Sequence, residues 1–230
     1  MAISSKQIGW SNENNLLWEI SKKLDGIIAS LAITTTTTTT TAYVCIDADV
    51  MIGSQTWKIC NLNVSTYSNG DPIPEITDQT DWVNATTGAW CWYNNDSANG
   101  PVYGRLYNYY AVNDPRGIAP AGYHVPSESE WQTLNSTIGG DGGALKEAGT
   151  THWTSPNTGA TNSTGFSALP GGIRASDGSF ALLNEYGFWW TSTPDVGDTS
   201  RDWALAYDTS AMLFGNSGNY LGFSVRLIQD

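Results

Sequence analysis

The sequence near the C-terminal end of the chain contains Gly187-Phe-Trp-Trp-Thr-Ser-Thr193 and Gly222-Phe-Ser-Val-Arg-Leu-Ile228. Both runs open on glycine and are rich in aromatic and β-branched residues, a composition typical of strands. The residues between them are mostly Asp, Ser, Thr, Asn and Gly. We therefore predict core strands that frame a polar, exposed surface.

Aromatic residues in this region make binding the first functional hypothesis. Trp189, Trp190, Trp203 and Tyr207 alternate with small polar residues. Aromatic rings held on rigid strands offer a large contact area at low entropic cost. The alternative is that several of these rings belong to the core, as Phe223 would.

Length and charge limit the classes of partner. The chain of 230 residues is long enough for one main domain and an appendage, and its formal net charge is −12. Because negative charge repels phosphate, we expect no nucleic acid and no anionic membrane as partners. Charged residues such as Glu13, Glu19 and Lys22 interrupt the N-terminal segment, so it predicts neither a secretory signal nor membrane insertion.

The N-terminal segment predicts an oligomerisation helix. Leu17, Ile20, Leu24, Ile27 and Leu31 follow a 3-4-3-4 spacing, which puts them on one seam of a helix. Leucine at a and isoleucine at d favour coiled coils of three or four strands, so we expect a homo-oligomer, a trimer. The alternative is a single amphipathic helix packed on its own domain.

An unbroken run of threonines follows this helix. Thr34–Thr41 lacks the apolar alternation that packing needs, and β-branched residues favour extended backbone, so we predict a spacer of up to about 26 Å. A glycosylated stalk is the alternative. The expected organisation is therefore an anchoring helix over residues 1–33, a spacer over 34–41 and a main domain over 42–230.

The main domain shows the pattern of an α+β fold with short strands and long loops. Ser127 and Glu130 form a capping box directly after Pro126, which predicts a helix that ends before Gly139. A second short helix is predicted over residues 144–148. One or two helices among many short strands indicate an α+β class.

Cysteine and histidine provide few catalytic or metal-binding combinations. Cys45, Cys60 and Cys91 lack metal-ligand spacing, and we predict buried free thiols, with a Cys45–Cys60 disulfide as the alternative. His124 lies in the capping motif, where a structural hydrogen bond is expected, and His152 has no identifiable partner in the sequence. We therefore expect no enzyme activity, no cofactor and no metal site.

Seven motifs, in order along the chain, resemble the Fibrobacter succinogenes major paralogous domain. The resemblance runs from about Val44 to the C-terminus and implies a C-type lectin-like fold and a ligand-display role. Related oxygenases use paired C-terminal cysteines as a copper site, but no cysteine follows Cys91, so that activity is not implied. The motifs are Ile52-Gly-Ser-Gln-Thr-Trp57, Asn61-Leu-Asn-Val64, Asn69-Gly-Asp-Pro-Ile-Pro74, Trp90-Cys-Trp-Tyr-Asn-Asn-Asp96, Gly104-Arg-Leu-Tyr-Asn-Tyr-Tyr-Ala-Val112, Gly122-Tyr-His-Val-Pro126 and Gly165-Phe-Ser-Ala-Leu-Pro-Gly-Gly172.

The same resemblance indicates where a ligand would bind. In relatives diversified by retroelements, the stretch between the aromatic strand and the final Gly-Phe carries the ligand contacts. Sugar recognition stacks an aromatic ring on the sugar while Asn and Asp bind its hydroxyls. The candidate ligand-binding residues are Trp190, Ser192, Asp195, Arg201, Trp203, Tyr207, Asn216, Asn219 and Tyr220.

The N-terminal segment carries a second, shorter resemblance. Ile8-Gly-Trp-Ser-Asn-Glu-Asn-Asn-Leu-Leu-Trp-Glu-Ile-Ser-Lys-Lys-Leu-Asp25 is similar to leader segments of virion proteins from phages that infect Bacteroidetes. We therefore expect a structural virion protein, as a head fibre, capsid decoration or tail fibre, assembled in the host cytoplasm and exposed on the virion. It would bind a capsid or tail protein through the N-terminal segment and a host-surface glycan through the main domain. A decoration without ligand and a secreted bacterial adhesin are the alternatives.

Overall fold

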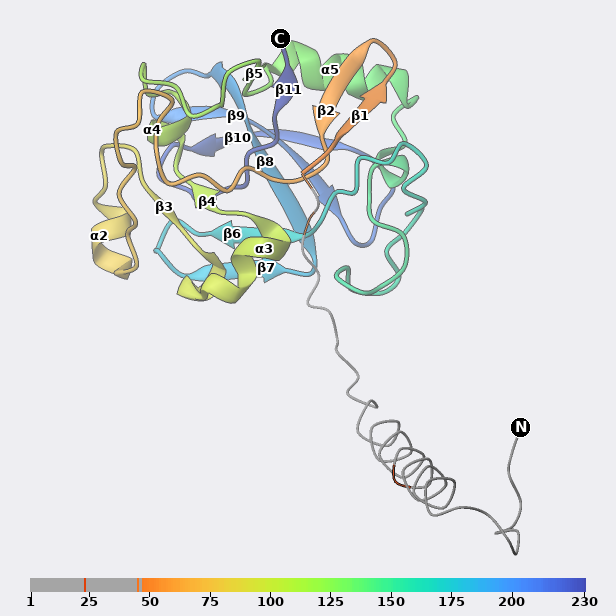
Figure 1. Ribbon diagram of the computed structural model, residues 1–230, viewed down its shortest axis with the longest axis horizontal. Helices are drawn as coiled ribbons and strands as arrows, with labels where there is room; N and C mark the ends of the chain where they lie inside the picture. The colour runs from red at the N-terminus through yellow and green to blue at the C-terminus, as the bar shows by residue number, and fades with distance from the viewer. Residues whose placement is uncertain (1–22, 24–44, 46) are drawn as a thin grey trace, which may run out of the picture. The chain divides into compact units, whose positions relative to one another are not determined.

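The computed structural model describes Lys23, Cys45 and residues 47–230 (Figure 1). The chain divides after Ala42. We call Cys45 and residues 47–230 the head. The predicted anchoring helix, with its seam residues Leu17, Ile20, Leu24, Ile27 and Leu31, and the Thr34–Thr41 spacer lie outside the described residues.

The head has the predicted α+β class, with mixed sheets and few helices (Figure 1). Its strands are β1 (Asp49–Ile52), β2 (Gln55–Lys58), β3 (Trp90–Cys91), β4 (Leu106–Tyr107), β5 (Tyr123–His124), β6 (Gly171–Arg174), β7 (Phe180–Leu183), β8 (Tyr186–Pro194), β9 (Thr199–Ala206), β10 (Leu213–Gly218) and β11 (Ile228–Gln229). The helices are α2 (Gln79–Val83), α3 (Gly100–Tyr103), α4 (Tyr109–Val112) and α5 (Glu128–Thr137), with 3-10 turns at Tyr93–Asn95, Ser97–Asn99 and Gly142–Ala144. None of the described helices meets the length and apolarity needed to cross a membrane.

The two larger sheets have different strand orders. One sheet runs β1-β2-β11-β5, so β2 near the start of the head pairs with the last strand, β11, through Trp57 and Ile228. The other sheet runs β10-β9-β8-β6-β7, with β10 at one edge and the long β8 in the middle (Figure 1). A short pair, β3 and β4, completes the described sheets.

Strand β8 is buried on both faces of its sheet. Successive side chains of a strand point to opposite faces. Trp189 therefore packs toward Trp131, with ring centroids 6.1 Å apart, while Trp190 packs on Phe223 at 4.4 Å. Both tryptophans are fully buried. The prediction of a core strand is confirmed for the first C-terminal run. The second run, residues 222–228, is buried but pairs mostly through isolated bridges, and only Ile228 belongs to a strand, β11.

Helix α5 is the helix that the capping motif predicts. The Ser127 hydroxyl accepts from the Glu130 N–H while the Glu130 carboxylate accepts from the Ser127 N–H, which completes the capping box. The prediction of a second helix over residues 144–148 is wrong. Leu145 and Glu147 instead exchange backbone hydrogen bonds with Ala168 in an extended pairing, so their backbone groups are not available to a helix.

The prediction of free thiols is wrong for two of the three cysteines. Cys45 and Cys60 form a disulfide, with their Cα atoms 5.7 Å apart. The β1–β2 hairpin brings them together, a proximity that sequence spacing does not reveal. Cys91 is a buried free thiol, as predicted, and burial raises its pKa to about 12.

Buried cationic side chains hold the loops of the head together. Arg174 is 1% exposed, and its guanidinium donates hydrogen bonds to the backbone carbonyls of Ile76 at 2.9 Å and of Thr77 and Asp78 at 3.0 Å. It also lies over the ring of Trp82, 4.8 Å from the centroid. One side chain thus provides hydrogen-bond donors to loop carbonyls that do not pair within a sheet.

Two further cations repeat this arrangement elsewhere in the head. The guanidinium of Arg226 donates to the carbonyls of Lys58, Ile59 and Phe166. The ammonium of Lys146 is likewise buried and donates to three backbone carbonyls, two in loops and one at the end of β9. Its acceptors lie at 2.8–3.0 Å, on Thr158, Ala206 and Thr209.

Replacing Arg174 by methionine tests this arrangement. The variant leaves the carbonyls of Ile76 and Gly178 without a donor, whereas those of Thr77 and Asp78 keep one. We expect the free energy of unfolding to fall by about 3–5 kcal/mol. Urea denaturation followed by tryptophan fluorescence measures the change. The matched control is Arg116→Met, which removes an exposed guanidinium paired with Asp114 and should leave the midpoint nearly unchanged. Equal shifts for the two variants would contradict the role of the buried cation.

Candidate ligand-binding surface

Two of the predicted ligand-binding residues belong to the core. Trp190 is fully buried and Trp203 is 3% exposed. Strands β8 and β9 lie inside the five-stranded sheet, and aromatic clusters cover both faces of that sheet at these positions. The expectation that these two rings contact a ligand is therefore corrected.

Three other predicted residues, Tyr207, Asn219 and Tyr220, are half-buried and contact other parts of the head. The Asn219 side-chain oxygen accepts from the Ser200 hydroxyl at 2.7 Å, and the Tyr220 carbonyl accepts from the Trp82 indole at 2.9 Å. Tyr207 packs against the core cluster that contains Trp203. Ser192, another predicted ligand-binding residue, is exposed, and its backbone N–H donates to the carbonyl of Pro126.

The structure brings Asp195, Arg201 and Asn216 together around one guanidinium. Asn216 pairs with Arg201 across strands β10 and β9, and the side-chain oxygen of Asn216 accepts a hydrogen bond from Arg201. The Arg201 guanidinium also lies 3.6 Å from the Asp195 carboxylate and 3.5 Å from that of Glu128, in the first turn of α5. One hydrogen bond and two ion pairs therefore fix the orientation of this partly exposed cation.

Besides Glu128, the sequence-based prediction missed Phe214 on this surface. Its side chain is 66% exposed, and its ring centroid lies 5.6 Å from that of Trp203. Phe214 is two residues from Asn216 on β10, so both side chains point to the same face. In the sequence, Leu213 and Phe214 are typical of a strand, but Gly215 and the polar residues after it are typical of a loop. The edge strand was therefore not predicted. We call Glu128, Asp195, Arg201, Phe214 and Asn216 the β9–β10 surface.

A buried carboxylate lies on the other face of the same two strands. Asp202 is 4% exposed, and one of its oxygens has no hydrogen-bond partner among the described residues. A methyl group added at Gly215, directly across on β10, would lie 3.7 Å from both carboxylate oxygens. Burial raises the pKa of Asp202 to about 6, although a hydrogen bond with Ser217 partly opposes this shift.

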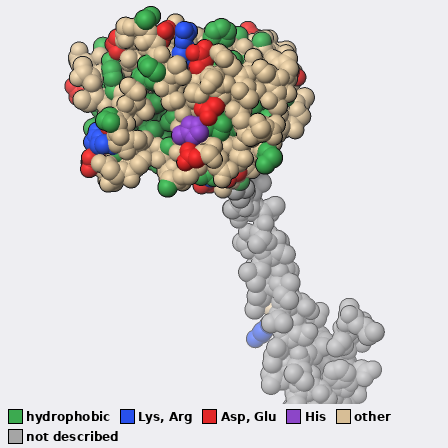
Figure 2. Space-filling model, turned by 90° about the horizontal axis from the view of Figure 1, so that it is seen from above, with side chains coloured by type: hydrophobic (Ala, Val, Ile, Leu, Met, Phe, Trp, Pro, Cys, Tyr) green, Lys and Arg blue, Asp and Glu red, His purple; other side chains and the backbone are tan. Residues whose placement is uncertain are grey.

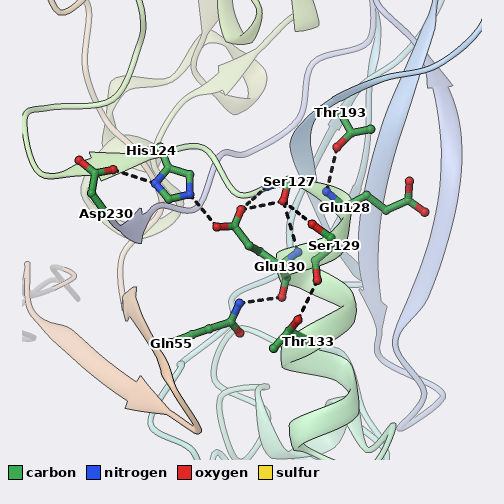
Figure 3. A network of polar contacts seen from close by, with 9 residues as sticks. All are labelled: Gln55, His124, Ser127, Glu128, Ser129, Glu130, Thr133, Thr193 and Asp230. Atoms are coloured by element: carbon green, nitrogen blue, oxygen red, sulfur yellow. Dashed lines mark hydrogen bonds and ion pairs between the residues drawn. The ribbon is translucent and has the colours of Figure 1, made fainter.

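His124 has the structural role that the capping motif predicts. Its ring nitrogens lie 2.8 Å from the carboxylates of Glu130 and Asp230, so it joins β5 to α5 and to the C-terminal residue (Figure 3). Burial alone would lower the pKa of His124, but the hydrogen bonds to the two carboxylates outweigh it and raise the pKa. The Ser127 hydroxyl bonds to Glu130, a component of the helix cap.

His152, in contrast, has the partner that the sequence did not reveal. Its Nδ1 lies 2.9 Å from both carboxylate oxygens of Glu147, so the prediction of a partnerless histidine is wrong.

No described residues form a group of three or more His, Cys, Asp or Glu side chains placed to hold a metal ion. Basic side chains are sparse on the face of the head shown in Figure 2.

A cavity beside the disulfide lies away from the β9–β10 surface. It has a volume of about 450 Å³ and is lined by the disulfide, Lys58, residues 61–64 and residues 100–102. The Lys58 ammonium is already paired with Asp47 and Asp49. The side-chain amide of Asn61 donates to the carbonyl of Tyr103. These polar groups are therefore already engaged within the head.

Comparison with known families identifies the head. The model of the Fibrobacter succinogenes major domain matches residues 50–229. The chain belongs to this family. The match includes both larger sheets and the β9–β10 surface, and it confirms the resemblance inferred from the seven sequence motifs. No curated protein and no solved structure matches the chain.

The buried Asp202 of this Fibrobacter succinogenes major domain gives a pH prediction. Its folded pKa of about 6 lies above the ordinary value of 3.8, so the ionised carboxylate destabilises the fold. This cost is complete above pH 6 and disappears as the pH falls toward 4. Asp202→Asn removes it, and we expect the variant to be more stable at pH 7.5 by about 1–3 kcal/mol.

Urea denaturation at pH 7.5 and pH 4.5 measures this difference. The stability gap between the variant and the parent should narrow sharply at the lower pH. Asp177→Asn is the control, because hydrogen bonds from Ser179 lower the pKa of that exposed carboxyl and no buried charge is removed. A gap that does not depend on pH would show that folding does not raise the pKa of Asp202.

Proposed function

We propose that the head is a C-type lectin-like display module whose β9–β10 surface contacts a host-surface glycan. The lectin-like architecture is supported by the pairing of β2 with β11, which joins the two ends of the head in one sheet. Long loops and short strands fill the rest of the head. Membership of the Fibrobacter succinogenes major domain family adds to this support.

The observation that carries the glycan proposal is the exposed ring of Phe214 beside oriented polar groups. A sugar stacks its apolar face on an aromatic ring and exchanges hydrogen bonds between its hydroxyls and planar polar side chains. Arg201 and Asn216 supply such groups on the same face as Phe214. Asp195 and Glu128 hold the guanidinium in place, which lowers the entropic cost of binding.

The open form of this surface favours weak, repeated contacts over one tight site. Small-molecule sites are usually concave, whereas Phe214 stands exposed on an edge strand. Several weak sites on one oligomer bind a repetitive surface through avidity. Avidity requires several heads on one particle. The trimer that we propose, formed by the helix seam before the threonine spacer, would provide them.

We also infer that the chain is a structural virion protein of a phage, as a head fibre, capsid decoration or tail fibre. The resemblance of the N-terminal segment to virion leaders supports this inference and gives that segment a capsid or tail protein as its partner. The Cys45–Cys60 disulfide supports exposure on the finished virion, since disulfides persist in oxidising surroundings. Assembly would take place in the host cytoplasm.

The second candidate function is structural decoration without a ligand. The observation that favours it is the pairing of Arg201 with three partners inside the head, because a satisfied cation has less to offer a ligand. A secreted bacterial adhesin would use the same surface with a different mode of export. Binding measurements separate the first candidate from the second.

Replacing Phe214 by alanine tests glycan binding. The full chain should bind a subset of bacterial surface glycans on an array, and Phe214→Ala should weaken that binding by a factor of about five or more, since an aromatic contact contributes about 1–3 kcal/mol. Met51→Ala is the control, because Met51 is 74% exposed on β1 in the other sheet. Equal binding by both variants would show that the glycan binds outside the β9–β10 surface, whereas no binding by the parent would favour the decoration.

Light scattering tests the oligomeric state. The full chain should have the mass of a trimer, while residues 42–230 should have the mass of a monomer, because the coiled-coil seam lies in the part that is removed. A monomeric full chain would contradict the seam. A trimer of residues 42–230 would show that the head itself associates.

A further inference from the structure

The disulfide lies where the N-terminal part of the chain joins the head. Cys45 is bonded to Cys60, and the β1–β2 hairpin lies between the two cysteines in the sequence. The first register pair of this hairpin, Asp49 with Lys58, is at its open end. Any pull on the chain before Cys45 therefore reaches the head at the open end of the hairpin.

Strand β1 is a weak place to bear tension. It lies at the edge of its sheet and pairs only with β2. Ion pairs from Lys58 to Asp47 at 3.0 Å and to Asp49 at 3.2 Å hold its beginning, but both carboxylates are exposed in part. A hairpin pulled at its open end separates one residue pair at a time, so each step opposes the force with few hydrogen bonds.

The segment around Cys60 is held far more strongly. Arg226 donates to the carbonyls of Lys58 and Ile59, and the Leu62 N–H donates to the carbonyl of Val225 at 2.7 Å. The Asn61 side-chain oxygen accepts from the Trp189 indole at 2.8 Å. These contacts connect the segment to β8 and to the chain that leads into β11.

We propose that the Cys45–Cys60 disulfide is a mechanical anchor. It transmits tension from Cys45 directly to Cys60 and the segment held by Arg226, so the hairpin between the cysteines carries no load. Without the bond, tension passes through β1 and separates the hairpin before the rest of the head unfolds. A display module on a tether would keep its orientation under load. The inference itself uses only contacts within the head and requires neither glycan nor virion.

Force spectroscopy on the full chain tests the anchor. One handle is attached at the N-terminus and the other at azidophenylalanine in place of Val196, a residue that is 84% exposed. The oxidised protein should show no step within the head before its cooperative unfolding. After reduction with a phosphine, an early step of up to about 35 Å should appear, because β1 and its turn, from Cys45 to Gln55, extend to about 3.3–3.6 Å per residue while β2 stays paired with β11.

The Cys45→Ser/Cys60→Ser double variant is the matched control. It should show the early step with or without reductant, since Cys91 is a free thiol in both conditions. Identical traces for oxidised and reduced protein would overturn the proposal. So would an early step of this length in the oxidised protein, or its absence from the double variant. Loss of glycan binding in other experiments would leave this result unaffected.

Discussion

The buried cations of the head connect its loops through backbone carbonyls, and the rest of the structure depends on this interaction. Several strands have only two residues, so ladder hydrogen bonds satisfy a limited part of the backbone. Arg174, Arg226 and Lys146 supply the missing donors at three separate places. Burying a charge is costly, but each of these cations makes several short hydrogen bonds and lies near an aromatic ring, which offset the cost.

The residues that stabilise the head are different from those that its β9–β10 surface exposes. The cations and the aromatic clusters lie inside the head, whereas Phe214, Asn216 and Arg201 lie on β10 and β9 at or beside the edge of the sheet. Their neighbours beneath the surface, such as Trp203, are held by core packing. A surface built in this way can change its polar and aromatic side chains while the loops behind it stay in place. Asp202, buried under the same strands, is an ionisable exception that makes stability depend on pH.

The sequence predicted the family, the core strand β8 and helix α5, because these depend on local patterns that the structure preserves. The burial of Trp190 was missed and that of Trp203 was only an alternative, since aromatic alternation does not show whether a strand is covered on one face or both. Phe214 was missed because glycine and polar neighbours obscured an edge strand. The roles of Arg174 and Lys146 were not predictable either, because charged residues are normally exposed and loop carbonyls carry no sequence signal.

The central claim is that the β9–β10 surface is independent of the framework that supports it. The most direct measurement is the melting temperature and glycan binding of a library in which Asp195, Arg201, Phe214 and Asn216 are varied together. The account predicts that most members melt within about 4 °C of the parent, a shift of roughly 1 kcal/mol, while their binding is lost or redirected. Melting temperatures that fall in parallel with binding would show that the surface is part of the framework and would contradict the account.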